Sequence, residues 1–309
     1  MPDGIAIVWG VGCGFLVAWA LSAIGTAVSR REPGLAAVAV LVALVWGTVA
    51  GLWILPAVPR LPPHSGLDRF LVILLPVTLA IEAEAAAGWL DGFWLTFERG
   101  IVALIAVPVL LHGSVWLSDN TPTAWVGLGG GALVLWAAWE GIASHVRGTG
   151  DRLVAAITVA AITSAGLAIM MAGWVRGGAV ALTLAAALGG AVLVAHRSAP
   201  GRGGSQAGLV GLSAAGIVAL FGLLVIGRFF GRLGSAPAAL LLMAPLVAAI
   251  AAGLSRFAPD NPAAIVARST RYRLLLAAVP LVAVLIAAKA DFDTTMGRLM
   301  ERAAAVIRP

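Results

Sequence analysis

Two acidic residues, Glu82 and Glu84, lie inside an apolar stretch of membrane length, residues 70–90 (FLVILLPVTLAIEAEAAAGWL). A helix rises about 1.5 Å per residue, so this stretch spans about 30 Å, the thickness of a bilayer's hydrocarbon core. Glu82 is then expected close to the midplane. An ionised group there costs roughly 2.5–3.5 kcal/mol, so membrane carboxylates usually face a partner, water or the bundle interior. We interpret the stretch as a candidate proton or substrate site.

The two acids have separate roles in this interpretation. They are two positions apart, about 200° around a helix, and therefore do not both point into one narrow cavity. Glu82 lies deeper and shares a face with Thr78, which makes it the better candidate for a protonatable or ligand-facing group. The alternative is that Glu82 is a neutral acid, or half of a structural hydrogen bond between helices.

Two further polar residues in apolar runs, His112 and Glu140, complete the candidate proton or substrate site. His112 follows Pro108 by one turn, and a lone histidine within the membrane is more often a hydrogen-bonded core residue than a ligand. Glu140 lies near a polar span end and is expected to reach the interface or to pair with an arginine, which favours a structural role. No two histidines have i,i+4 spacing and the chain has one cysteine, Cys13, so we expect neither a metal nor another cofactor.

Arg228 and Arg232 form a basic pair with i,i+4 spacing. They are four positions apart beside Phe229 and Phe230, so a continuous helix would place both guanidinium groups on one face. Together they could hold an anionic lipid headgroup, and ordinary interfacial anchoring is the alternative.

Composition determines the class of protein that must position these residues. The chain is 61% hydrophobic and only 11% charged, with a mean hydropathy of +1.02, whereas soluble domains have roughly 25% charged residues. Its apolar runs are apolar on every side for about 20 residues, which excludes the alternating strands of a membrane β-barrel. We predict an all-α polytopic membrane protein with no soluble domain, integral to the cytoplasmic (inner) membrane.

Ten apolar runs are long enough to span a bilayer, and together they predict a single helical bundle over residues 1–309. No positively charged segment precedes the first run, so we expect it to be retained rather than cleaved. For residues 293–309 the sequence leaves two alternatives, an amphipathic helix in the membrane interface and a frayed tail. The predicted spans are 5–28, 34–56, 70–90, 101–118, 124–144, 153–175, 178–196, 208–229, 237–256 and 274–290.

The 19 arginines and the one lysine lie mostly between these runs. The gaps after odd-numbered spans hold eleven, including Arg99, and the opposite side holds nine. By the positive-inside rule this small excess favours both termini outside the cytoplasm. We interpret the net charge of +6 as a topology and lipid-headgroup signal, with no nucleic-acid partner.

Absent motifs narrow the function. The chain has no Walker loop, HExxH, cysteine pair or GxSxG, so it binds no nucleotide through a known motif and is not expected to be an enzyme. The leading hypothesis is a secondary carrier of a small solute, coupled to protons through Glu82. The first alternative is a non-transporting subunit or scaffold that packs against lipids, a partner membrane protein or a second copy of itself. The second is an enzyme acting on a lipid-linked substrate.

Overall fold

The computed structural model describes residues 3–29, 32–90, 92–118, 121–197, 203–255 and 262–307. The fold is all-α, 89% helical, with no strand in those ranges. Ten of its helical segments are long and apolar enough to cross a membrane, which confirms the predicted class and number of spans. The protein is an integral, multi-pass membrane protein.

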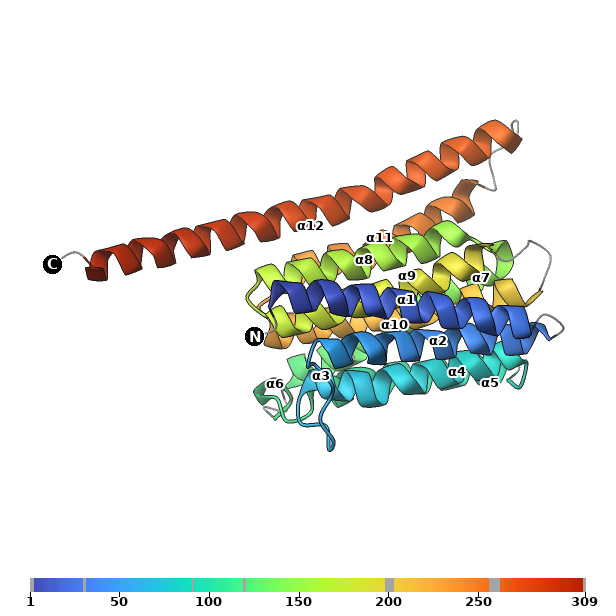
Figure 1. The fold of residues 1–309 in the computed structure, drawn as a ribbon, viewed down its shortest axis with the longest axis horizontal. Helices are drawn as coiled ribbons and strands as arrows, with labels where there is room; N and C mark the ends of the chain where they lie inside the picture. The colour runs from blue at the N-terminus through green and yellow to red at the C-terminus, as the bar shows by residue number, and fades with distance from the viewer. Residues whose placement is uncertain are drawn as a thin grey trace.

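Ten crossing segments follow one another in alternating directions, joined by short connections (Figure 1). The third consists of three consecutive elements, a short α-helix, a π-helical turn and a longer α-helix. One further short helix, α6, precedes the fifth segment. In chain order the elements are α1 (Gly4–Val28), α2 (Pro33–Ile54), α3 (Gly66–Arg69), η1 (Phe70–Leu74), α4 (Leu75–Ala87), α5 (Gly92–Leu111), α6 (Val115–Ser118), α7 (Pro122–Thr149), α8 (Arg152–Met171), α9 (Val175–Arg197), α10 (Gly203–Phe230), α11 (Ser235–Ser255) and α12 (Pro262–Ile307).

Helix α10 forms the centre of the bundle. In its most apolar window 94% of the residues are buried, against 17% for the outer helices α1 and α12. Helices α2, α4, α7, α8 and α9 pack around α10, while α12 lies on the outside against α8 and α11 (Figure 1). Small residues allow this close packing, because α10 consists largely of Gly, Ala, Leu and Val.

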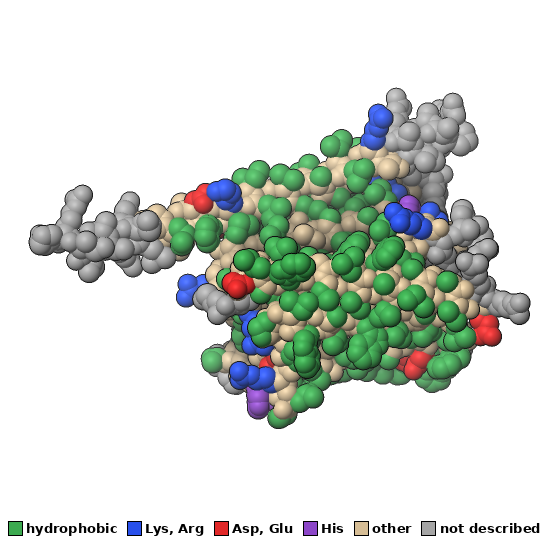
Figure 2. All heavy atoms as spheres, viewed as in Figure 1, with side chains coloured by type: hydrophobic (Ala, Val, Ile, Leu, Met, Phe, Trp, Pro, Cys, Tyr) green, Lys and Arg blue, Asp and Glu red, His purple; other side chains and the backbone are tan. Residues whose placement is uncertain are grey.

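The surface has the distribution of side chains that a membrane requires. On the face shown in Figure 2, hydrophobic side chains cover the middle of the bundle, and the charged side chains lie toward its two ends. The exposed apolar side chains belong to every outer helix, as in Trp9, Trp53, Leu104 and Val279. Exposed apolar side chains of this kind are typical of helices that cross a membrane.

Local sequence signals define several helix starts. Asp3 and Thr121 accept hydrogen bonds from the backbone N–H groups of Ala6 and Ala124, and so cap α1 and α7. Ser65 and Asp68 form a reciprocal capping box at the start of α3. Each cap satisfies a backbone donor that the first helical turn leaves free.

The third span differs from the predicted one at both ends. It covers Gly66–Ala87, and Glu82 therefore lies five residues from its end, about 7–8 Å along the axis, nearer to one surface than the prediction of residues 70–90 implies. The span also contains the π-helical turn, in which the N–H of Leu75 donates to the carbonyl of Phe70. Pro76 follows immediately, and a proline has no N–H for the regular i→i−4 bond, so the preceding turn widens.

The connection between α8 and α9 lies earlier in the chain than predicted. The predicted spans 153–175 and 178–196 place it at residues 176 and 177, but α8 ends at Met171 and α9 begins at Val175. The turn occurs at Gly173, which has a φ of +95°. Gly178 instead serves helix packing, because a Cβ there would lie 2.5 Å from the carbonyl oxygen of Gly166 on α8.

Helix α12 is one continuous element from residue 262 to residue 307. Arg268, Arg271 and Arg273, expected in a long loop, therefore lie on this helix. The predicted tail, residues 293–309, continues the last span through residue 307 and extends beyond the bundle in Figure 1. The tail is thus helical, as in the first alternative, but it does not form a separate helix, and its place in the membrane interface stays a prediction.

Candidate functional site

A buried ion pair joins the third and fourth spans. The carboxylate of Glu82 on α4 accepts two hydrogen bonds from Arg99 on α5, from Nε to Oε1 and from Nη2 to Oε2, each 2.9 Å long. The exposed fraction is 1% for Glu82 and 0% for Arg99. Two parallel charge-assisted bonds of this kind hold a guanidinium and a carboxylate in one plane. Burying such a pair in the membrane interior costs far less free energy than burying either charge alone.

Helix α7 adds two more groups to the pair. Glu140 Oε2 accepts a hydrogen bond of 3.1 Å from Arg99 Nη1, and the indole Nε1 of Trp139 donates to Glu82 Oε1 over 2.8 Å. The Arg99 guanidinium also lies 5.6 Å from the ring centre of Trp139, within the range of a cation–π contact. We call Glu82, Arg99, Trp139 and Glu140 the buried cluster. It holds three helices together with two negative charges and one positive charge.

Arg99 is the residue that sequence reasoning missed. It was assigned to a loop and counted as a topology charge, but α5 begins at Gly92 and buries Arg99 in its second turn. Without Arg99, ten basic residues remain against nine, so the charge count no longer favours one orientation. Five others in that count lie outside the described residues: Arg30, Arg31, Arg202, Arg256 and Arg308. The helical periodicity of α5 could have indicated that Arg99 is buried. Arg99 shares a face with the buried residues Val102, Ala103 and Ala106, and the exposed residues Phe93, Trp94 and Phe97 lie on another face.

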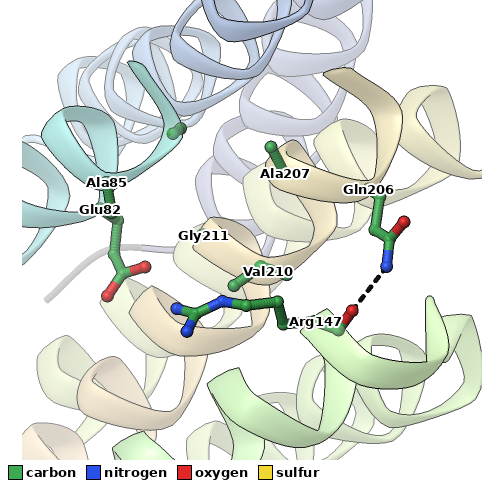
Figure 3. Close-up of a pocket in the computed structure, with 8 residues that line it drawn as sticks. Glu82, Ala85, Arg147, Gln206, Ala207, Val210 and Gly211 are labelled. Atoms are coloured by element: carbon green, nitrogen blue, oxygen red, sulfur yellow. Dashed lines mark hydrogen bonds between the residues drawn. The ribbon is translucent and has the colours of Figure 1, made fainter. Parts of the chain in front are cut away.

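Beside the buried cluster lies a cavity of about 390 Å³, which we call the Glu82 cavity. The end of α4, the end of α7 and the start of α10 enclose it. Glu82 forms one wall, and the Arg147 guanidinium points across the cavity toward it (Figure 3). The Gln206 side chain anchors the other rim by donating to the Arg147 carbonyl oxygen over 2.6 Å. The remaining lining is small and apolar: Ala85, Ala86, Ala207, Val210 and Gly211.

The Glu82 cavity lies near one membrane surface. Arg147 and Gln206 are exposed at the ends of their helices, whereas Glu82 is buried at the inner wall. A small solute entering from that surface would meet a cation, an amide and then the buried cluster. These are the few convergent polar groups in an otherwise apolar pocket that typify small-molecule sites.

The structure brings together only two of the four residues predicted for the proton or substrate site. Glu82 and Glu140 meet at Arg99, one of the pairings expected for Glu140. Glu84 is partly exposed and lies outside the buried cluster, as its helical offset predicts. His112 follows the end of α5, at the opposite surface, where its carbonyl oxygen accepts a hydrogen bond from Arg69.

The predicted arrangement of Arg228 and Arg232 is wrong in one respect. Helix α10 ends at Phe230, and Arg232 has a φ of +58°, so the two residues do not share a helical face. Arg228 Nε donates to the Ser235 hydroxyl over 2.7 Å. Both side chains are exposed at one end of the bundle, and their contact with lipid headgroups stays a prediction.

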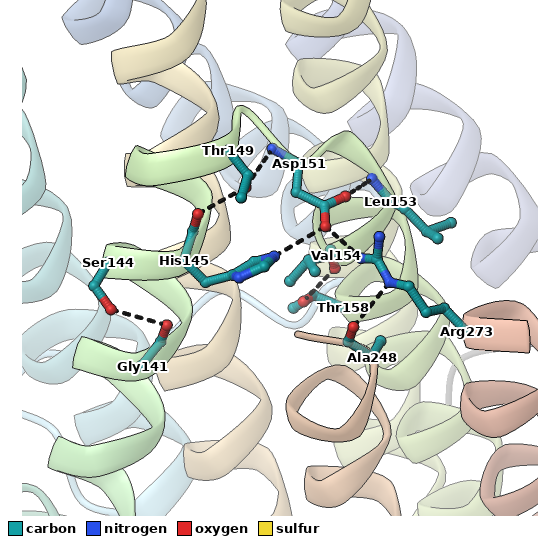
Figure 4. Close-up of polar contacts among 10 residues, drawn as sticks. All are labelled: Gly141, Ser144, His145, Thr149, Asp151, Leu153, Val154, Thr158, Ala248 and Arg273. Atoms are coloured by element: carbon teal, nitrogen blue, oxygen red, sulfur yellow. Dashed lines mark hydrogen bonds and ion pairs between the residues drawn. The ribbon is translucent and has the colours of Figure 1, made fainter. Parts of the chain in front are cut away.

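A second polar cluster ties α12 to the bundle (Figure 4). Asp151 caps α8 through a 3.0 Å bond from the Leu153 N–H, and it also contacts His145 Nε2 at 3.0 Å and the Arg273 guanidinium of α12. Arg273 Nε donates in addition to the Ala248 carbonyl oxygen of α11 over 2.9 Å. Burial opposes ionisation of Asp151, but His145, Arg273 and the Leu153 N–H together hold the pKa of the carboxyl below its ordinary value.

Within the described ranges, no three His, Cys, Asp or Glu side chains lie close enough together to hold a metal ion. No model of a known protein family matches the chain, and neither the curated proteins nor the solved structures contain a significant match. Fold and site therefore define a class only: a ten-span helical membrane protein with a charged cluster buried beside a cavity.

Proposed function

We propose that the protein is a proton-coupled carrier of a small solute, with the Glu82 cavity as the solute site. One observation supports this proposal above the others: two carboxylates share one buried guanidinium, and one of them, Glu82, lines a cavity together with the exposed side chains of Arg147 and Gln206. Charged groups within a membrane bundle typically mark ion or substrate pathways.

Within the cluster, Glu140 is the better proton carrier. Both oxygens of Glu82 accept hydrogen bonds, from Arg99 and Trp139. Glu140 uses Oε2 alone, and its Oε1 is buried without a partner, although the side chain as a whole is 22% exposed. A proton on Oε1 would neutralise the excess negative charge of the cluster, and the side-chain exposure gives that proton a path.

Arg147 provides a means of coupling. Its positive charge offsets the excess negative charge of the buried cluster, and a solute carboxylate bound to Arg147 would remove that offset. Protonation of a carboxylate in the cluster would restore the balance of charge, so binding of the solute would be coupled to uptake of a proton. Solute and proton would then move in the same direction.

Alternating access requires the bundle to open at the far end as well. The third span has a natural point of bending, the π-helical turn Phe70–Leu74, which Pro76 follows. The π-helical turn ends one helical turn before Thr78. Such turns often lie at functional sites, and interrupted helices are common in secondary carriers. We expect α4 to move about this turn relative to α10.

Proton movement in proteoliposomes tests the proposal. Vesicles containing the protein and a trapped pH-sensitive dye would receive small carboxylates and amino acids from outside, one at a time. At least one solute is expected to drive inward proton movement, which Glu140→Gln abolishes while the variant still folds. The matched control is Glu84→Gln, a change of the same chemistry on α4 outside the buried cluster, which leaves the movement intact.

Two results would contradict the carrier. One is proton movement that survives Glu140→Gln. The other is the absence of proton movement in vesicles of wild-type protein with every solute tried. The scaffold alternative also has an observation in its favour, because a Glu82 carboxylate with both oxygens bonded suits a permanent structural pair. Stoichiometric retention of a partner membrane protein in mild detergent, together with the absence of proton movement, would support that alternative.

A further inference from the structure

A second cavity lies at the end of the bundle opposite the Glu82 cavity. Its volume is about 500 Å³, and it is enclosed by the chain that follows α2 and by the turn between α8 and α9. We call it the Arg60–Arg176 cavity after the two cations in its lining. The other lining residues are Leu55, Pro56, Ala57, Val58, Gly173, Trp174, Val175 and Ala179.

The two arginines of this cavity are available to a ligand. Among the residues that the structure describes, neither Arg60 nor Arg176 has an acidic side chain within ion-pairing distance. The Nε of Arg176 is buried and has no hydrogen-bond partner. A buried donor without an acceptor is costly, so a native structure normally supplies the acceptor.

One acidic residue, Asp68, attracts Arg176 from a distance without pairing with it. Its carboxylate is already occupied: it accepts hydrogen bonds from the Ser65 hydroxyl and backbone N–H, and from the backbone N–H of Arg60. Asp68 thus fixes the chain at Arg60 and leaves both guanidinium groups unpaired. Against the single charge of Asp68, the two arginines keep one excess positive charge.

The start of α9 adds backbone donors on the same wall. Val175 and Arg176 are the first residues of this 23-residue helix, where N–H groups have no acceptor within the helix. Trp174 precedes them, and an indole has no acceptor atom with which to cap them. The partial positive charge at a helix N-terminus adds to that of the two arginines.

We propose that the Arg60–Arg176 cavity binds a phosphate-type oxyanion, either free in solution or as the headgroup of an anionic lipid. Its oxygens would accept from the Arg176 guanidinium, including the unpartnered Nε, from Arg60 and from the first N–H groups of α9. Arginine is suited to this task because its planar donors match two oxygens of a phosphate at once. Pro56, Val58 and Trp174 also line the cavity and offer apolar surface to a substituent of the oxyanion.

Binding of two probes tests the site and distinguishes the sources. The first is radiolabelled inorganic phosphate, measured by equilibrium dialysis against delipidated protein in a non-ionic detergent. The second is phosphatidylglycerol in nanodiscs, compared with phosphatidylcholine by native mass spectrometry. Arg176→Gln and Arg60→Gln are each expected to weaken binding about tenfold or more, because each removes a charge-assisted contact. Arg176→Lys keeps the charge but not the paired donors, and should lie between wild type and Arg176→Gln.

Lys289→Gln is the control, since Lys289 is a basic residue on α12 that is 68% exposed and lies outside the cavity. It should leave both affinities within about twofold of wild type. A selective loss of phosphate binding in the cavity variants supports a soluble oxyanion. A selective loss of phosphatidylglycerol binding alone supports a lipid headgroup. Equal losses in Lys289→Gln and Arg176→Gln, or no loss in Arg60→Gln and Arg176→Gln, would overturn the proposal. Arg60 is exposed, so Arg60→Gln keeps the test decisive even if Arg176→Gln fails to fold.

Discussion

Replacing Arg99 by glutamine should destabilise the protein more than any other single change of charge. The substitution leaves the Glu82 carboxylate, 1% exposed, with Trp139 as its remaining donor in the buried cluster. Removing one partner of a buried ion pair typically costs about 3–5 kcal/mol, because the other charge stays buried and unpaired. Glu140 adds less to this cost, since its side chain is 22% exposed and water can reach it.

A second substitution should recover much of the loss. In the double variant Glu82→Gln/Arg99→Gln the buried carboxylate is gone, and neutral amides can still accept from Trp139 and donate to Glu140. We expect the double variant to be more stable than Arg99→Gln alone by at least 1–2 kcal/mol. Arg99→Lys keeps the charge but loses the paired geometry, so its stability should lie between wild type and Arg99→Gln.

Unfolding by SDS titration in mixed micelles, followed by tryptophan fluorescence, measures these free energies. Asp293→Asn is the control, because it breaks the exposed i,i+4 pair Lys289–Asp293, whose side chains are 68% and 57% exposed. Such a pair contributes at most about 0.5 kcal/mol. A cost below 1 kcal/mol for Arg99→Gln, or a double variant no more stable than Arg99→Gln, would refute the cluster as a coupled buried unit.

Two further predictions concern packing and pH. Gly51→Ala should cost about 1–3 kcal/mol by the same titration, because the new Cβ would lie 2.6 Å from the Gly10 carbonyl oxygen of α1; Gly12→Ala on α1, with open space around it, should be neutral or slightly stabilising. Since the folded pKa of Asp151 is lowered, its ionised form stabilises the fold above the ordinary value of 3.8, and this contribution is lost as the pH falls through the lower, folded value. Melting temperatures of wild type and Asp151→Asn, which keeps a capping side chain, should therefore differ above about pH 5 and converge in acid; a difference that does not change with pH would contradict this.

Hydropathy predicts the spans well because a membrane acts on each segment locally. A run of apolar residues inserts whatever its neighbours are, so the ten crossings could be predicted from residue order alone. The start of the fourth span was predicted wrongly because a charge in it is neutralised by a residue on another helix. The charge is that of Arg99, and single-residue hydropathy assigns it a high cost that its pair with Glu82 removes.

The glycine contacts between α1 and α2 could not be predicted from the sequence. Gly10 and Gly14 have the spacing of a small-residue contact face. The structure places them against Gly47 and Gly51, with the Thr183 side chain of α9 at the same crossing. Many similar glycine pairs occur in this chain, and only the packed bundle distinguishes those that hold helices together.

The sequence alone determines that this protein is an all-α membrane bundle of ten spans, and that Glu82 and Glu84 lie on different faces of one helix. Both follow from local periodicity and from the cost of exposing polar groups to lipid. Only the tertiary structure decides that Arg99 bonds to both Glu82 and Glu140, and that His112 lies at the other surface. These pairings join residues 17 and 41 positions apart, and they depend on which helices pack together, which no local pattern specifies.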